Sequence, residues 1–305
     1  MSTPFPGEHA AGLPGSPARP VAPTLTAVLR GLVAEPGRPR LTWYGPDGER
    51  VELSGHVLDN WVTKTTNLLV EELDVGPGRT VLLDLPAHWR TVLWALAVWR
   101  TGACVLLASS GPAAGSAAAP AGPTGPAGTP APDVVVTARP ELATAPGSEV
   151  VVVALPALAR SVGAALPPGA IDAAAAVMTY GDALGHVPPT DPAAAALRVD
   201  GAGADDDAHP AHTGHGEAPT SVLHGGLVAW ALDGEPLAAP GTGGSAPHRV
   251  LLEPADERPA PVLRAVLAAY ATGGSVVLCA PSVAAQLAAD PQRRERLVAA
   301  ERITG

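Results

Sequence analysis

Histidine and aspartate residues gather in one short segment of the chain, DDDAHPAHTGHGE. The histidines are His209, His212 and His215, and the aspartates before them are Asp205, Asp206 and Asp207. Imidazole and carboxylate groups together bind zinc and other first-row cations. Pro210 and Gly214 are typical of a loop, which does not hold ligands in place in advance. Two interpretations stay open: a metal-responsive loop, and a polar surface linker that the composition favours.

Other sequence motifs for catalysis are absent. The sequence has no G-x-S-x-G elbow, no G-x-x-x-x-G-K-[ST] loop and no G-x-G-x-x-G after a strand. The glycine-rich run 241–245 lies among prolines and is interpreted as a linker. Cys104 and Cys279 lie in apolar runs and are predicted to be small buried side chains. Three tryptophans, spaced five residues apart between Trp89 and Trp99, are predicted to pack in the core.

Alternating signals for strands and helices cover the first third of the chain. After a tail at 1–20 that is predicted to be disordered, caps and apolar spacing predict elements in the following order. These are a helix from Thr24, strands at 39–45 and 49–54, a helix capped by Ser54, a strand at 79–85, a helix at 88–100 and a strand at 103–107. The continuous apolar strands are typical of a parallel sheet covered on both faces.

The rest of the chain combines weaker elements with low-complexity segments. Residues 109–132 are predicted to be a flexible insert and residues 185–220 a polar loop. Strands are expected at DVVVT, EVVVVAL and 275–279, and helices at 171–180, 222–232, 261–272 and from Asp290-Pro291 onward. We therefore predict an α/β fold over residues 21–305, with an open, mostly parallel, multi-layer sheet and flanking helices.

The stretch from Leu41 to Leu107 resembles the opening of adenylate-forming enzymes, the class of acyl-CoA synthetases and AMP-binding proteins. The residues that carry the resemblance are LTWYGPDGERVELSGHVLDNWV and VGPGRTVLLDLPAHWRTVLWALAVWRTGACVLLA. DVVVTARPEL and RVLLEPADERPAPVLRAVLAAYATGGSVVLCAP resemble later parts of the same region. The chain is also similar to shortened actinobacterial relatives of these enzymes. The resemblance implies the fold of their N-terminal region.

The segment AHTGHGEAPTSVLHGGL resembles the family's phosphate-binding loop, YTSGTTGxPKG. The resemblance assigns Thr213, Gly214, Pro219 and Thr220 to this cofactor-binding loop, and matches His224 to a histidine that often follows it. Thr220 stands where the family has lysine, and Glu217 stands where it has glycine. A carboxylate in place of small or basic groups repels a triphosphate by roughly 1 to 4 kcal/mol per charge pair. The resemblance therefore implies a degenerate loop that does not hold ATP productively.

The chain contains a single lysine, Lys64, which the helical spacing places on the polar side of the second helix as a solvated charge. The family's later motifs, including a catalytic lysine, do not occur in this sequence. We therefore predict no catalytic residues, no cofactor and no metal; the alternative in which ATP or AMP still binds stays open.

Charge and composition limit the classes of partner. The net charge is −10 and no basic stripe with aromatics occurs, so nucleic acid is not expected as a partner. No signal peptide or membrane-spanning run is recognised, and a cytoplasmic protein is predicted. An unpaired sheet edge makes a protein partner or a homodimer the expected assembly.

Three functional hypotheses follow. The first is a non-catalytic relative of adenylate-forming enzymes that serves as a binding or interaction module. The second is a ligase fragment that binds adenylate or acyl-CoA and needs a partner for the missing domain. The third is a metal-responsive protein that uses the histidine segment.

Overall fold

The computed structural model describes residues 21–107, 131–139, 147–163, 165–199, 220–233 and 248–304. Its strands form two sheets. The order is β10-β11-β1-β2 in one, sheet A, and β7-β6-β5-β3-β4-β8-β9 in the other, sheet B. All neighbours are parallel except the pairs β1–β2 and β8–β9. The predicted mostly parallel, multi-layer α/β fold is confirmed.

Sheet A joins the two ends of the described chain. It consists of β1 (Pro39–Tyr44), β2 (Arg50–Ser54), β10 (Arg249–Leu252) and β11 (Ser275–Cys279). The pair β1–β2 is a hairpin whose turn is the short 3-10 helix η1 (Pro46–Gly48). Strand β11 pairs in parallel with β1 through Leu41 and Val276. Residues more than 200 positions apart in the sequence therefore share one sheet.

Sheet B contains the apolar runs of the middle of the chain. Its strands are β3 (Thr80–Asp84), β4 (Cys104–Leu107), β5 (Val134–Thr137), β6 (Glu149–Val152), β7 (Ile171–Asp172), β8 (Ala195–Val199) and β9 (Thr220–Leu223). Its central strands β4 and β5 are buried at every position. The run of Val and Leu in these strands follows from their burial on both faces.

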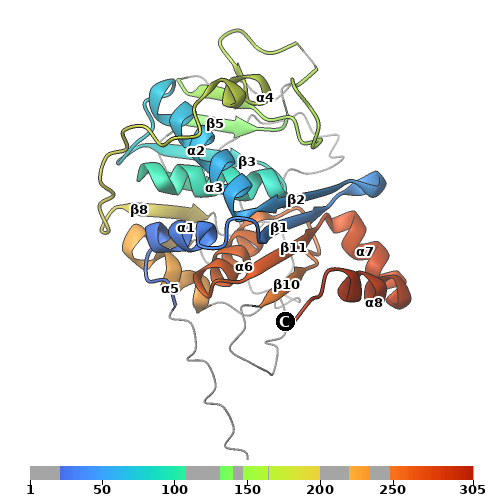
Figure 1. Ribbon diagram of the computed structural model, residues 1–305. Helices are drawn as coiled ribbons and strands as arrows, with labels where there is room; N and C mark the ends of the chain where they lie inside the picture. The colour runs from blue at the N-terminus through green and yellow to red at the C-terminus, as the bar shows by residue number, and fades with distance from the viewer. Residues whose placement is uncertain are drawn as a thin grey trace, which may run out of the picture.

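The helix α3 (Trp89–Thr101) crosses between the two sheets and contacts strands of both (Figure 1). Twelve of its thirteen residues are buried, which explains its apolar character all round. Helices α1 (Leu25–Val33), α2 (Gly55–Glu71) and α6 (Pro259–Ala271) pack beside it. Ser54 caps α2 as predicted, and Thr24, where a helix was predicted to begin, caps α1; each accepts a hydrogen bond from a backbone N–H of the first turn.

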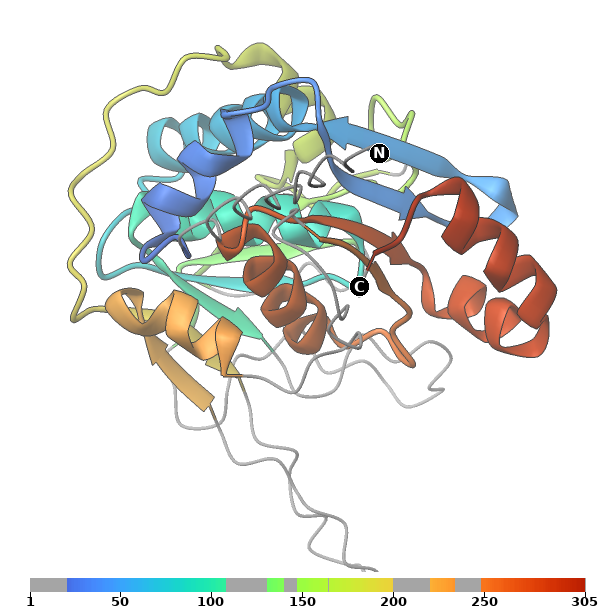
Figure 2. The ribbon, with the colours of Figure 1, turned by 60° about the horizontal axis from the view of Figure 1, so that its bottom comes forward.

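The remaining helices lie toward the outside. The short elements α4 (Ala173–Ala176), η3 (Val177–Thr179), η4 (His224–Gly226) and α5 (Leu227–Leu232) follow strands of sheet B. Helices α7 (Pro281–Ala289) and α8 (Pro291–Ala300) form an outlying pair beside sheet A (Figure 2). Asp290 caps α8 as predicted, through a hydrogen bond from the Arg293 N–H.

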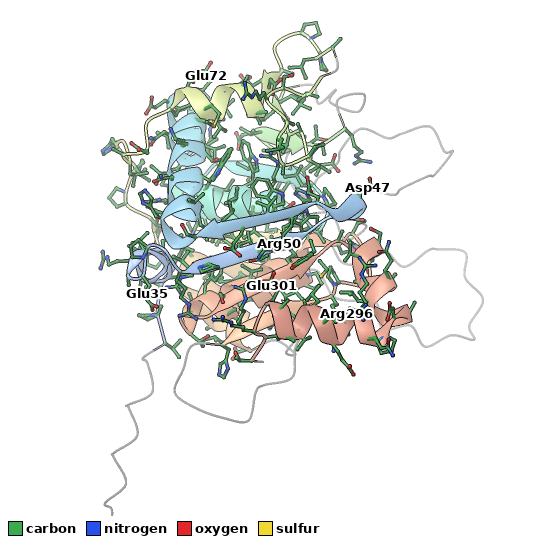
Figure 3. All side chains as sticks on the ribbon, turned by 45° about the vertical axis from the view of Figure 1, so that its right-hand side comes forward. Glu35, Asp47, Arg50, Glu72, Arg296 and Glu301 are labelled. Carbon is green, nitrogen blue, oxygen red and sulfur yellow. The ribbon has the colours of Figure 1, made fainter. Side chains whose placement is uncertain are left out.

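A carboxylate near the end of the described chain holds the edge of sheet A. Glu301 is buried, and its Oε1 atom accepts from Arg50 at 2.9 Å and from the Tyr44 hydroxyl at 2.5 Å. Arg249 donates to its other oxygen. Arg50 and Glu301 lie close together on this side of the molecule in Figure 3. The cluster connects the residues after α8 to β1, β2 and β10.

Two parts of the sequence prediction were wrong. The segment 185–220 was predicted to be a polar loop, but Ala195–Val199 is strand β8, since β4 offers it a free parallel edge. The helix predicted at 222–232 begins later, at Leu227, because residues Thr220–Leu223 form β9 against β8. The predicted tail 1–20 and nearly all of the predicted insert 109–132 lie outside the described residues.

Candidate functional site

Of the predicted phosphate-loop residues, Thr220 is described; Thr213, Gly214 and Pro219 lie outside the described residues. Thr220 opens β9 and faces Val199, the last residue of β8, in an antiparallel pair. Strand β8 is parallel to β4, so this end of the hairpin lies at the carboxyl edge of sheet B. The fold therefore brings Thr220 to the edge where parallel sheets commonly bind ligands.

The strand order places a topological switch point at the same edge. From β3 the chain passes to β4 on one side, and β5 then returns to the other side of β3. In open α/β sheets, ligands bind outside the carboxyl ends of strands where this reversal occurs. The switch point here lies between the carboxyl ends of β3 and β5.

Three polar side chains meet at this switch point. The hydroxyl of Thr137 donates to Oδ2 of Asp84 at 2.6 Å, and Nε of Arg139 donates to the same oxygen at 3.1 Å. A second guanidinium nitrogen of Arg139 donates to Oδ1. Asp84 thus forms a bidentate ion pair with Arg139 and is not free to act as a general base. The arrangement fixes the ends of two strands and leaves the Arg139 side chain 30% exposed.

A second cluster connects the two sheets at their carboxyl ends. Glu49 accepts from the Trp43 indole at 2.9 Å and from the Ala157 N–H at 2.8 Å. His88 caps α3 by accepting from the Arg90 N–H at 3.1 Å. Burial, aided by the charge of Arg90, lowers the pKa of His88 to about 3. This imidazole is neutral near pH 7 and cannot exchange protons there as an acid–base catalyst.

Arg90 stacks on tryptophan in the same cluster. Its guanidinium lies 4.3 Å from the ring centre of Trp89 and donates to the carbonyls of Leu155 and Pro156. Burial lowers the pKa of Arg90 to about 10, so it stays charged. The contacts are those of a structural cation on an aromatic face.

Lys64 is not the solvated charge that the helical spacing predicted. Its ammonium group donates to the backbone carbonyl of Tyr180, and the residue is only partly exposed. Asn67, one turn further along α2, is buried; it donates to the carbonyls of Gly181 and Ala183. The polar side of α2 is therefore covered by the segment that follows η3, which the sequence periodicity alone could not reveal.

The predicted metal ligands His209, His212 and His215, with Asp205, Asp206 and Asp207, lie outside the described residues. Within the described ranges, no group of three or more His, Cys, Asp or Glu side chains is arranged to hold a metal ion. No described helix has the length and apolar character needed to cross a membrane.

The cysteines and the tryptophans of α3 are buried, as predicted. Burial raises the pKa of the Cys104 thiol to about 11 and that of the Cys279 thiol to about 12, which keeps both protonated and unreactive. Trp99 donates its indole N–H to the Ala196 carbonyl at 2.9 Å. None of these side chains is a nucleophile.

Comparisons with solved structures identify the fold. The acyl-CoA synthetase of Brucella canis superposes with a TM-score of 0.57 at 20% identity, covering 83% of this chain and 42% of its own. Acetoacetyl-CoA synthetase of Streptomyces lividans gives 0.58 at 17% identity, covering 84% and 38%. The N-terminal subdomain of Klebsiella oxytoca NpsA gives 0.52 at 13% identity, covering 92% and 60%.

The sequence comparison gives one clear relative. A TIGR03089 family protein of Mycobacterium tuberculosis is 48% identical over 80 residues, which are 26% of this chain and 33% of that protein. No family model matches the chain. The chain thus spans about a third of this relative and about two fifths of the two synthetases. The predicted fold of the N-terminal region of adenylate-forming enzymes is confirmed.

Asp84, Thr137 and Arg139 were not predicted as site residues. Asp84 and Thr137 end apolar strands, and Arg139 follows two residues after Thr137. Because the carboxyl ends of neighbouring parallel strands lie at one edge, polar residues directly after such runs were a usable signal.

Proposed function

We propose that this chain is a non-catalytic relative of adenylate-forming enzymes that keeps their N-terminal fold as a binding or interaction module. The observation that carries the proposal is the place of its single lysine. Lys64 lies on α2 and is bound to the Tyr180 carbonyl, whereas Thr220 begins β9 at the position that the resemblance gives to lysine.

The charge at the hairpin supports the same proposal. In the family resemblance, the lysine of the phosphate loop offsets the charge of ATP, and Thr220 cannot do so. Glu217, which the sequence sets in the same loop, adds repulsion. At roughly 1 to 4 kcal/mol for each charge pair, the two changes together weaken ATP binding by orders of magnitude.

The polar side chains at the carboxyl edge of sheet B are engaged in structural contacts. Asp84 is paired with Arg139, and His88 caps α3 with a pKa of about 3. Neither is an available acid or base near neutral pH. These side chains stabilise strand and helix ends, which suits a scaffold better than a reaction centre.

The experiment that tests the proposal is ATP–pyrophosphate exchange with a panel of carboxylic acids. The expected result is no exchange above that of a control reaction without the protein. A thermal melt with Mg-ATP, AMP and CoA accompanies it, because a ligand at a hundred times its Kd stabilises the fold by about 2.7 kcal/mol. Exchange with any acid would overturn the proposal.

A second candidate function is a ligase fragment that binds adenylate or acyl-CoA with a partner protein supplying the missing domain. The match to 42% of the length of an acyl-CoA synthetase favours it. A rise in melting temperature of several degrees with ATP or AMP supports this candidate, since 1 kcal/mol corresponds to about 2–4 °C for a domain of 150–250 residues. No shift with any of the three ligands favours the module.

The metal-responsive alternative is tested separately. Zinc titration of the full chain and of a variant with alanine at His209, His212 and His215 distinguishes specific uptake from none. Uptake that is unchanged in the variant excludes this alternative.

A further inference from the structure

A cavity of about 200 Å³ lies at the opposite end of the β8–β9 hairpin from Thr220. It is open to solvent on one side and is lined by the start of α1, the end of α3, the loop around Thr190 and the start of η4. Its lining includes Leu25, Leu29, Trp99, Arg100 and His224. Because β9 separates His224 from Thr220, about 13 Å of extended chain lies between the cavity and the predicted phosphate-loop residue Thr220.

The N-terminus of α1 offers unpaired backbone donors to this cavity. Thr24 caps the helix by accepting from the Ala27 N–H at 3.2 Å. The N–H groups of Leu25 and Thr26 precede the first intrahelical bond, and nothing in the described ranges accepts from them. Both residues line the cavity. Donors and helix dipole together favour a negative charge here.

Arg100, near the end of α3, supplies a cation to the lining. Its Nη1 atom donates to Asp59 at 3.3 Å and to Thr63 at 3.0 Å. Its Nε and Nη2 atoms make no hydrogen bond within the described part of the chain. A planar guanidinium with donors to spare matches the two oxygens of a carboxylate.

His224 lines the same cavity with a half-buried imidazole ring. Its Nε2 atom is shielded from solvent. Burial lowers the pKa of His224, while the backbone carbonyls of Gly102 and Ala103 and the charge of Asp191 act in the opposite direction.

The negative charges nearby are already engaged. The Asp59 carboxylate is paired with Arg100, and Asp191 accepts from the Ala193 N–H at 2.8 Å. Asp59 therefore occupies the Nη1 atom of Arg100 and leaves the Nε and Nη2 atoms to a ligand.

The size and the apolar wall define the ligand class. Leu25, Leu29, Trp99 and Pro192 line one part of the cavity. An apolar cavity of about 150 Å³ holds benzene, so about 200 Å³ accommodates a compact ring or short chain with one charged group. We propose that this cavity binds a small organic carboxylate, with its oxygens toward Arg100 and the α1 N-terminus.

The test compares two variants of one exposed position. Thr26→Glu puts a carboxylate at the rim of the cavity, and it suits the helix N-terminus, so the fold is expected to be retained. Thr26→Gln is the matched uncharged control. Calorimetric titration of the full chain with sodium benzoate is expected to show binding that Thr26→Glu weakens by about tenfold or more, equal to 1.4 kcal/mol, and that Thr26→Gln largely keeps.

The site is located by amide spectra of the labelled protein. Benzoate is expected to move the signals of Leu25, Thr26 and His224, and to leave Thr220 unchanged. If about 10 mM benzoate gives neither heat of binding nor shifts of the amide signals, the Kd is far weaker than that of a specific site. This result would overturn the proposal. Equal shifts with inorganic phosphate would overturn the carboxylate class. Shifts of the Thr220 signal instead would place benzoate at the other end of the β8–β9 hairpin and would overturn the proposed cavity site. The proposed function is tested separately, by ATP–pyrophosphate exchange.

Discussion

Lys64 and Tyr180 lie 116 residues apart in the sequence, yet the ammonium group of the first donates to the backbone carbonyl of the second. The bond attaches η3 and the following segment to α2. Asn67, three residues after Lys64, also binds this segment. Its side chain accepts from the Gly185 N–H at 3.0 Å and donates to the carbonyls of Gly181 and Ala183. The single lysine of the chain therefore has a structural role away from the hairpin that Thr220 begins.

Replacing Lys64 by methionine is expected to lower the free energy of unfolding by about 1–2 kcal/mol, because the half-buried Tyr180 carbonyl loses its donor while most of the apolar stem is kept. Urea denaturation measures the change. Lys64→Arg, which keeps a donor, is the control and is expected to lose less. If the methionine variant also changed the response to Mg-ATP, the structural role would be wrong.

Replacing Thr220 by lysine is expected to strengthen Mg-ATP binding, because the substitution restores a positive charge at the start of β9. One added charge pair contributes roughly 1 to 4 kcal/mol, or about fivefold in affinity at the lower end. Thermal shift against Mg-ATP concentration measures the gain. Thr220→Gln, similar in polarity and uncharged, should show none; an equal response of both variants would contradict the charge argument.

Acid is expected to destabilise the protein through Glu301. Burial acts to raise the pKa of Glu301, but hydrogen bonds from Tyr44, Arg249 and Arg50 outweigh it and hold the pKa below 4.5. The unfolded chain thus binds this proton more readily, so the stabilisation is complete above about pH 4.5 and is lost as pH falls through the lower, folded value.

The Glu301→Gln variant isolates this contribution, since Asp133 also has a lowered pKa and adds to the acid sensitivity. Unfolding measured from pH 7 down to pH 3 should show the variant less stable at pH 7 by about 1–3 kcal/mol. The difference from the unmodified chain should shrink below about pH 4.5. A constant difference over this range would show that Glu301 does not titrate as inferred.

Two glycines near the contact of α1 with α2 are expected to respond in opposite ways. A Cβ atom on Gly55 would lie 2.0 Å from the Leu32 carbonyl oxygen, whereas one on Gly31 meets nothing within 4 Å. Gly55→Ala is expected to destabilise by about 2–3 kcal/mol through steric overlap. Gly31→Ala, within α1, should stabilise by about 0.5–1 kcal/mol. Thermal melts of both variants measure the effect, and similar shifts in the two would refute the packing argument.

The sequence by itself determined the local elements of the first hundred residues and several later ones. Thr24, Ser54 and Asp290 cap the helices that the spacing predicted, because a cap acts through atoms within three residues of itself. The apolar runs of β3, β4 and β5 indicated a buried parallel sheet for the same local reason. The resemblance of Leu41–Leu107 then gave the fold class.

Only the tertiary structure decided what depends on distant partners. Strands β8 and β9 are short and partly polar. They are strands because β8 pairs with the edge of β4 and β9 pairs with β8. The polar face of α2 became an interior surface when the segment after η3 covered it. Asp84 and Arg139 meet because β3 and β5 are neighbours, although the two residues are 55 positions apart in the sequence. Local propensity cannot encode such contacts, since their free energy arises only once the sheet has formed.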